Sequence, residues 1–208
     1  MGYFLLYESM LDTVLYARDK WLVPGGLMFP DRANLYICAI EDGEYRGEKI
    51  DFWDNVYGFD MSYIKEAAMT EPLVDCVNAK AINSTAVPVL SIDITKVTKE
   101  ELDFTSPFEI KMTRNDYVHG LVCYFDVQFS ACHTNVGFST GPRDEYTHWK
   151  QTVFYLDHEL MANKGESITG TISTKRNPKN PRDLDIQLTT KFAGKDSQIE
   201  QDRLYRLR

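Results

Sequence analysis

The residues with the clearest chemical potential lie in two short segments far apart in this sequence. The first segment, Met1–Met10, contains the carboxylate Glu8. The second, Tyr146–Thr152, contains His148 beside Trp149. A carboxylate can hold a planar guanidinium through two parallel hydrogen bonds, and an indole face can pack against a cation. Taken alone, a residue such as Glu8 is more often a solvated helix glutamate, and a residue such as His148 a structural histidine. Residue types alone leave both assignments open.

Other kinds of site find little support in the sequence. No group of His, Cys, Asp and Glu residues shows the spacing of metal ligands, so His119, His133 and His158 are interpreted as structural. No GxGxxG motif occurs, and Gly25-Gly26 is interpreted as a turn after a helix rather than as a phosphate or nucleoside cradle. We therefore expect these residues to build no metal site and almost no cofactor site.

Composition bounds the class of protein and its partners. The chain has 208 residues, enough for one large domain or one domain with an appendage. Aromatic residues make up 12% of the chain, which favours a strand-rich fold. The net charge of -8 argues against nucleic acid as a direct partner, because phosphate binding needs clustered Lys and Arg. This charge could attract basic peptides, or it could serve only solubility.

The cysteines and the apolar runs indicate an intracellular protein. The four cysteines match no zinc pattern and no CxxC motif, so we expect them to be reduced thiols. No apolar run approaches the length of a membrane span. Glu8 and Asp12 interrupt the apolar N-terminal stretch, so no signal peptide is expected and no membrane partner either.

The N-terminal residues predict a helix followed by two strands. Apolar residues recur at helical spacing from Tyr7 to Leu22, and the Val23–Gly26 segment ends that helix because it contains proline and glycine. Leu27–Phe29 is expected to form a short strand. Ala33–Ile40 is a longer apolar run and is predicted as a second strand.

Residues 43–80 follow no clean period. This segment is rich in aromatic residues, and a short helix is expected to begin near Asp60, or at Ser62, and to end near Met69. Such a segment could be an arm that projects from its domain and packs on something else. It could also be an irregular excursion that packs on its own domain, and spacing alone favours that second interpretation.

From Val87 onward, strand signals dominate. Apolar and polar residues alternate around 90–94, 108–112, 119–129, 152–156, 168–172 and 184–192. Turn signals at 105–107, 141–144 and 177–181 separate these runs. Regularly spaced strands joined by polar turns indicate an antiparallel β-barrel or a β-sandwich.

Ordered motifs along the whole chain resemble those of the type I protein arginine methyltransferases. Besides the acidic loop at Met1–Met10 and the Thr-His-Trp loop at Tyr146–Thr152, the matching motifs are Tyr16–Leu22, Phe29–Ala33, Asn55–Ser62, Arg114–His119, Gly137–Thr140 and Asn180–Asp185. The resemblance implies a mainly β chain in three parts. Residues 1–31 would be the C-terminal remnant, helix plus strand, of a Rossmann-like cofactor domain. Residues 32–208 would form an antiparallel β-barrel substrate domain, with a helical dimerisation arm at about 43–77.

The resemblance assigns catalytic roles to two residues. The family uses two glutamates to hold the substrate arginine, and Glu8 matches one of them. The other would precede Met1. His148 matches the histidine that bridges the barrel to an acidic group in the cofactor half and supports the active-site base network.

The resemblance also assigns substrate-binding roles. Trp149 matches a residue that lines the arginine tunnel, and Thr147 belongs to the same loop. Met10 matches a methionine near the transferred methyl that shapes the choice of product, and Tyr3 matches an aromatic residue of the same pocket.

The arm implies a homodimer. In the family the arm docks on the cofactor domain of the second subunit and forms a ring-like head-to-tail dimer. The resemblance therefore favours a projecting arm at these residues, whereas spacing alone favours an irregular excursion that packs on its own domain. Phe52 departs from the tryptophan common at its position. The expected apolar contact residues are Phe52, Trp53, Tyr57, Phe59, Met61 and Ile64.

The resemblance implies an enzyme that transfers methyl groups from S-adenosylmethionine to arginine guanidino nitrogens of Arg/Gly-rich proteins and histones, in cytoplasm and nucleus. Because most of the cofactor half is expected to lie outside this chain, we expect the chain alone to be inactive and to bind little or no S-adenosylmethionine. The alternative is a non-catalytic β-barrel that binds Arg-rich peptides. A sugar-binding sandwich would leave the two loop matches unexplained.

Overall fold

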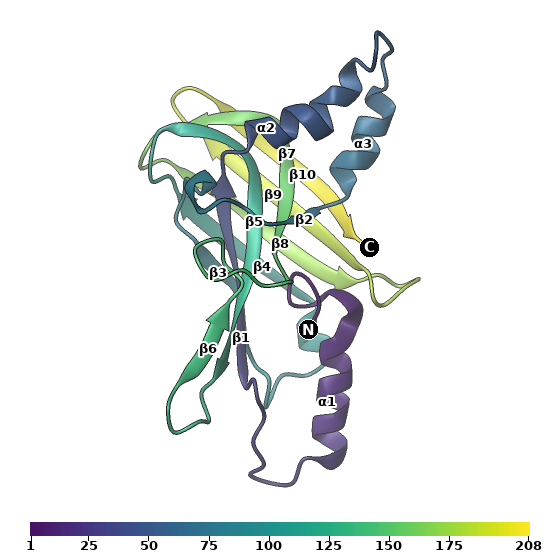
Figure 1. Ribbon diagram of the computed structural model, residues 1–208, viewed down its shortest axis with the longest axis vertical. Helices are drawn as coiled ribbons and strands as arrows, with labels where there is room; N and C mark the ends of the chain where they lie inside the picture. The colour runs from purple at the N-terminus through teal and green to yellow at the C-terminus, as the bar shows by residue number, and fades with distance from the viewer.

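The alternating apolar residues build two antiparallel sheets that face each other, as the computed structural model of residues 1–208 shows (Figure 1). The arm formed by α2 and α3 projects from one end of the sheets, and α1 lies at the other end. The helices are α1 (Met10–Trp21), α2 (Gly43–Tyr45) and α3 (Ser62–Thr70), with short 3-10 or π turns at Tyr7–Ser9, Arg46–Ile50, Asp51–Asp54, Ala79–Ala81 and Glu100–Leu102. The strands are β1 (Arg32–Ile40), β2 (Leu73–Asp75), β3 (Val87–Asp93), β4 (Phe104–Lys111), β5 (Asp116–Phe129), β6 (Val136–Ser139), β7 (Gln151–Ala162), β8 (Ser167–Arg176), β9 (Leu184–Ala193) and β10 (Gln198–Leu207).

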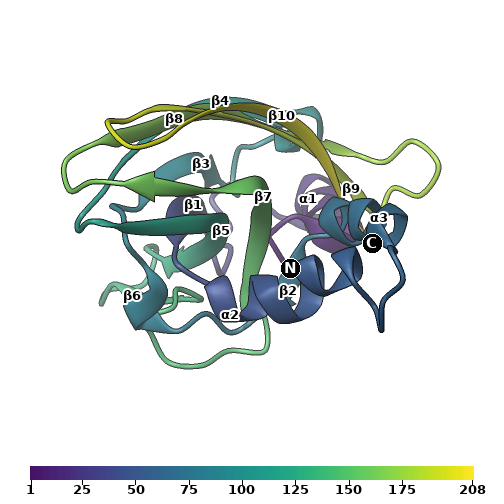
Figure 2. The same cartoon turned by 90° about the horizontal axis from the view of Figure 1, so that it is seen from above.

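The sheets meet along both edges. One sheet has the strand order β2-β7-β5-β1-β3, with β6 paired to one end of β5, and the other has the order β10-β9-β8-β4. Strands β3 and β4 lie next to each other at one edge, and β10 lies next to β7 at the other. Seen from above, the layer of β4, β8 and β10 curves over the layer of β1, β5 and β7 (Figure 2). This mainly β, antiparallel and barrel-like architecture with a helical arm confirms the expected fold class.

The main core fills the space between the sheets. On β1 the inward residues are Leu35, Ile37 and Ala39, which are fully buried. Phe154 of β7 in the same sheet and Ile186 of β9 in the other sheet are also fully buried. Burial of each large apolar side chain contributes about 1.5–3 kcal/mol, so this core holds the two sheets together.

The first sheet is also covered on its outer face, by the root of the arm. Cys38 and Ile40 of β1 and Val122 of β5 point to this side, where they pack with Ile50 and Met69 of the arm. Because β1 and β5 are buried on both faces, their sequences read as nearly continuous apolar runs.

Three local predictions were wrong. Leu27–Phe29 forms no strand, because no neighbouring strand of this chain supplies the backbone hydrogen bonds a strand needs. Residues 105–107 lie inside β4 rather than in a turn; Pro107 is accommodated because β4 is an edge strand. The regular helix begins at Met10, not at Tyr7.

The other predicted elements are confirmed. The helix expected near Asp60 or Ser62 is α3, and the Asp60 side chain accepts a hydrogen bond from the Ser62 backbone N–H at 2.9 Å.

The four cysteines form no disulfide. None of the helices is sufficiently long and apolar to cross a bilayer.

Candidate functional site

Residues 1–9 form a tight loop that folds against the end of the core. The Tyr7 backbone N–H donates to the Tyr3 carbonyl at 3.1 Å, which closes the loop. Phe4, Leu5 and Glu8 have positive φ angles of 55°, 66° and 68°, a conformation unfavourable for residues with a Cβ. Phe4 and Leu5 are almost completely buried in the main core. Their burial offsets the backbone strain and fixes the loop that carries Glu8.

Gly2 is required by this loop, because a Cβ at that position would collide with the Tyr7 carbonyl. We therefore expect Gly2→Ala to destabilise the chain by about 1–3 kcal/mol, as overpacking does. Gly47→Ala is the matched control, since a Cβ there meets nothing within 4 Å. Thermal denaturation followed by circular dichroism should show a lower Tm for the first variant only; equal Tm values would contradict this packing.

Glu8 is held on this loop from the far end of the chain. Its backbone N–H donates to the Arg182 carbonyl at 2.8 Å, and the Arg182 guanidinium Nη2 donates to Glu8 Oε1 at 2.7 Å. The Ser9 hydroxyl donates to the Pro181 carbonyl. The motif at Asn180–Asp185 therefore positions the acidic loop, and Glu8 is an exposed loop residue rather than a helix residue.

The second segment joins the first through Trp149. The indole Nε1 donates to the Met1 carbonyl at 2.7 Å, and the indole ring packs on Phe125 and Phe138. His148 is exposed and makes no hydrogen bond; its ring centroid lies 4.0 Å from that of Trp149. The structure thus brings the two predicted segments together, although no hydrogen bond or ion pair joins Glu8 to His148.

The remaining residues predicted for substrate binding lie on the same two segments. The Tyr3 ring stacks on the Tyr7 ring at 6.1 Å, and burial is the main cause that raises the pKa of Tyr7, followed by the Asp183 carboxylate. Met10 is the first residue of α1 and is half-exposed. Thr147 accepts a hydrogen bond from the Lys150 backbone N–H at 3.1 Å, and its own hydroxyl is buried without a partner.

The outer part of the arm carries the six predicted dimer residues. Tyr57 is 94% exposed and Phe59 72% exposed, at the turn that joins the two helical parts of the arm. Phe52, Met61 and Ile64 are also exposed, whereas the Trp53 indole is half-buried and its Nε1 donates to the Lys49 carbonyl at 3.1 Å. These residues form an apolar surface that this chain does not cover.

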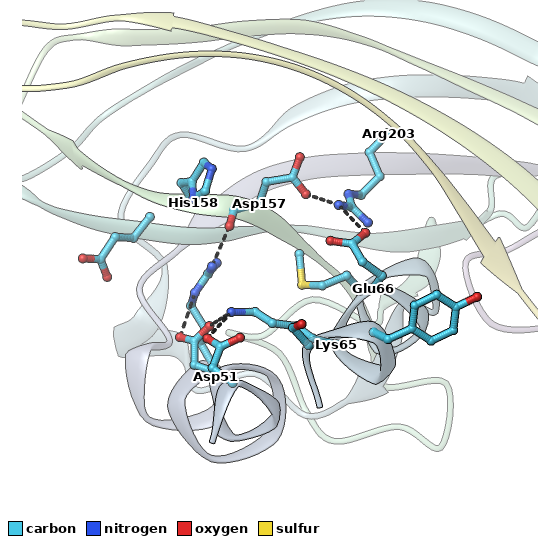
Figure 3. A pocket seen from close by; sticks show the side chains of 12 residues that line it. Asp51, Lys65, Glu66, Asp157, His158 and Arg203 are labelled. Atoms are coloured by element: carbon cyan, nitrogen blue, oxygen red, sulfur yellow. Dashed lines mark hydrogen bonds and ion pairs between the residues drawn. The ribbon is translucent and has the colours of Figure 1, made fainter. Parts of the chain in front are cut away.

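Sequence reasoning missed the ion-pair network at the root of the arm. The buried Arg46 guanidinium donates to the carbonyls of Leu156 and Asp157 at 2.6 and 2.8 Å. Figure 3 shows Arg203 between Asp157 of the barrel and Glu66 of the arm. A cavity of about 880 Å³ is lined by Arg46, Glu66, Asp157 and Arg203, among others. None of its lining residues belongs to Met1–Met10 or Tyr146–Thr152. The sequence shows no periodic pattern at the charged residues of this network, because the partners lie on separate helices and strands.

Comparison with known proteins decides the family. Residues 31–196 match the family model described as the arginine methyltransferase oligomerization subdomain. The chain belongs to the protein arginine methyltransferase family. Over all 208 residues it is 59% identical to protein arginine N-methyltransferase 1 of Chlamydomonas reinhardtii. It is 52% identical over the same length to probable protein arginine N-methyltransferase 1.2 of Arabidopsis thaliana.

Solved structures of this family support the fold. The whole chain superimposes with a TM-score of 0.97 and 44% identity on a chain of the Trypanosoma brucei PRMT1 enzyme–prozyme heterotetrameric complex with AdoHcy. Arabidopsis thaliana protein arginine methyltransferase 10 matches with a TM-score of 0.83 at 23% identity, which shows the shared fold alone. This chain spans 60% and 57% of the two curated relatives and 66% of the Trypanosoma chain.

The cavity beside the acidic loop is small. Its lining includes Leu6, Ser9 and Leu11, and its volume is about 10 Å³. No group of three or more His, Cys, Asp or Glu residues gathers in a way that could hold a metal ion.

The buried thiols of this arginine methyltransferase chain do not suit nucleophilic chemistry. Burial raises the pKa of Cys38 to about 12 and that of Cys123 well above the usual value. A thiol with such a pKa stays protonated near neutral pH and is a poor nucleophile. The two loops offer the Glu8 carboxylate, the His148 imidazole and the aromatic side chains of Tyr3 and Trp149.

Proposed function

We propose that this chain supplies the substrate-holding loop and the dimerisation arm of a type I protein arginine methyltransferase. Such an enzyme transfers methyl groups from S-adenosylmethionine to arginine guanidino nitrogens of Arg/Gly-rich proteins and histones, in cytoplasm and nucleus. The observation that carries the proposal is the Glu8 carboxylate, which sits on a strained, anchored loop and already binds a guanidinium at 2.7 Å.

In this proposal Glu8 holds the substrate arginine. A guanidinium presents its N–H donors in a rigid plane, so a fixed carboxylate sets the direction in which the remaining nitrogen points. The carboxylate also draws positive charge to the nitrogens it contacts, which leaves more electron density on the attacking nitrogen. Fixed orientation and electrostatic preorganisation of this kind are large terms in catalysis.

The other loop residues shape the site around that arginine. Trp149 ties the Thr-His-Trp loop to Met1, so its indole forms a wall next to the acidic loop. The exposed imidazole of His148 is free to accept a partner from the cofactor half, and Thr147 supports the same loop. Tyr3 and Met10 flank Glu8 in sequence and would limit the space for the transferred methyl group.

The methyl donor would be held by residues outside this chain, which spans 60% of the length of the Chlamydomonas relative. We therefore propose that residues 1–31 complete a cofactor domain whose other parts lie elsewhere. Residues 32–208, with the arm at about 43–77, would then form the substrate and dimer part. The chain alone would be inactive.

A chimeric enzyme tests this function. The part of the Chlamydomonas relative that the match leaves uncovered is joined to this chain, and methylation of an Arg/Gly-rich peptide is followed by mass spectrometry. The expected product is asymmetric dimethylarginine, formed only with the wild-type Glu8. A chimera that binds peptide but makes no methylated product would favour the non-catalytic peptide-binding alternative.

The exposed apolar residues of the arm are expected to make the chain associate. The exposed apolar side chains of the arm lack the surface on which they are expected to dock, so we expect non-native, concentration-dependent association. The doubly substituted variant Tyr57→Asp/Phe59→Asp should be monomeric, because two charges would have to be buried in any contact. Val136→Asp places the same charge at an apolar, 53% exposed residue of β6 outside the arm and serves as control. Light scattering that shows a monomer at every concentration for the wild type would contradict the expectation.

A further inference from the structure

Glu8 already has a guanidinium partner inside this chain. Arg182 Nη2 donates to Glu8 Oε1 at 2.7 Å, and no second bond between the two side chains is formed. If Glu8 binds the substrate arginine, as proposed above, Arg182 occupies part of the carboxylate that the substrate needs. The two guanidinium groups then compete for one site.

The competition is between nearly equivalent partners. Both are guanidinium groups, so a substrate arginine that replaces Arg182 restores the bond that it breaks. The Arg182 side chain is 66% exposed and the Glu8 side chain 47% exposed, so solvent screens the pair and the pair is easily broken. Displaced Arg182 can move into water at little cost.

The position of Glu8 does not depend on the Arg182 side chain. The Glu8 backbone N–H is bonded to the Arg182 backbone carbonyl, and the Ser9 hydroxyl is bonded to the Pro181 carbonyl. Any residue at position 182 would keep the first of these bonds. Loss of the guanidinium should therefore free the Glu8 carboxylate without releasing the loop that carries it.

We propose that Arg182 is an internal placeholder for the substrate arginine: its guanidinium holds the Glu8 carboxylate until an arginine of the substrate displaces it. The inference rests on the proposed role of Glu8. As a consequence, a peptide that binds Glu8 must first break the bond between Arg182 and Glu8, and the free energy of that bond lowers the affinity for the peptide. Removal of the guanidinium should make binding tighter, whereas removal of a residue that merely positions Glu8 would make it weaker.

Binding of a fluorescent Arg/Gly-rich peptide to the full 208-residue chain, measured by anisotropy, tests the inference. We expect Arg182→Ala and Arg182→Gln to lower the Kd by about two- to five-fold, the size of effect that an exposed ion pair allows. Arg206→Ala is the matched control: it removes the same charge from an exposed arginine that contacts Asp185 rather than Glu8, and it should leave Kd unchanged. In a Glu8→Gln background, Arg182→Ala should have no effect on Kd.

The outcomes separate this inference from the proposed function. An unchanged or higher Kd for both Arg182 variants, with Glu8→Gln still weakening binding, would overturn the placeholder and leave the role of Glu8 intact. A Glu8→Gln variant that binds as well as wild type would overturn the role of Glu8 and the inference with it. Absence of binding by both the wild type and the Arg182 variants at millimolar peptide would have the same meaning.

Discussion

Replacement of Glu8 by glutamine is expected to weaken binding of an Arg/Gly-rich peptide to this chain by about 10- to 100-fold. The carboxamide keeps the size of the side chain but removes its charge and turns one acceptor into a donor that faces the guanidinium. Hydrogen bonds to charged groups contribute about 1.5–3 kcal/mol, which corresponds to this range of affinity. In the chimeric enzyme the same substitution should lower kcat/KM at least as much, because orientation of the attacking nitrogen is also lost.

The matched control for this prediction is Glu109→Gln. Glu109 is an exposed residue of β4 that forms no ion pair, and its substitution changes the net charge equally. Peptide titration should give the wild-type Kd for the control and a much higher Kd for Glu8→Gln. Equal Kd values for the two variants would mean that only the overall charge attracts the peptide.

Replacement of Phe154 by alanine is expected to lower the free energy of unfolding by about 3–5 kcal/mol, the cost of removing a phenylalanine from a packed core. Phe154 of β7 is fully buried, and its ring packs edge-on against Phe4 of the acidic loop and Tyr205 of β10. One side chain thus joins the two sheets and the loop that carries Glu8. Its loss should loosen all three.

Urea denaturation monitored by circular dichroism measures this effect. Phe154→Leu is the control, because it keeps most of the buried volume and should cost only about 1–1.5 kcal/mol. Peptide binding should weaken in the alanine variant even where the chain remains folded, since Phe4 loses its support. A loss of stability below about 1 kcal/mol in the alanine variant would show that this contact does not hold the sheets together.

Much of the fold could be predicted because the apolar residues alternate in the sequence with the same period as the buried side chains of a strand. Strands β1, β5, β7, β8 and β9 each carry an apolar face that points into one core, and alternation reveals such a face directly. Strand β10 was not predicted. Its buried residues Gln201, Tyr205 and Leu207 include polar groups, and the Tyr205 hydroxyl is satisfied by the distant Tyr155 carbonyl at 2.6 Å.

The errors have local physical causes. Pro107 is a turn signal in most contexts, and only its place on an edge strand makes it compatible with β4. Leu27–Phe29 has the composition of a strand but no neighbour to pair with. The positive φ angles of Glu8 and Ser9 delay the start of α1, and they depend on contacts with residues more than 170 positions away.

The candidate site was predictable only in part. The resemblance proposed Glu8 and Trp149 as site residues, and the structure links their segments through the bond from Trp149 to Met1. The bond from Arg182 to Glu8 could not be predicted, because it joins two exposed residues far apart in sequence. The network around the buried Arg46 was missed because its partners lie about 110 positions away in the sequence.

Transfer of a labelled methyl group from S-adenosylmethionine to an Arg/Gly-rich peptide tests the central claim most directly. The purified chain alone is predicted to leave the peptide unlabelled, and the chimera with the uncovered part of the Chlamydomonas relative is predicted to label it, with Glu8→Gln abolishing the signal. Labelling by the purified chain without a second polypeptide would contradict the account, as would a chimera whose activity is indifferent to Glu8.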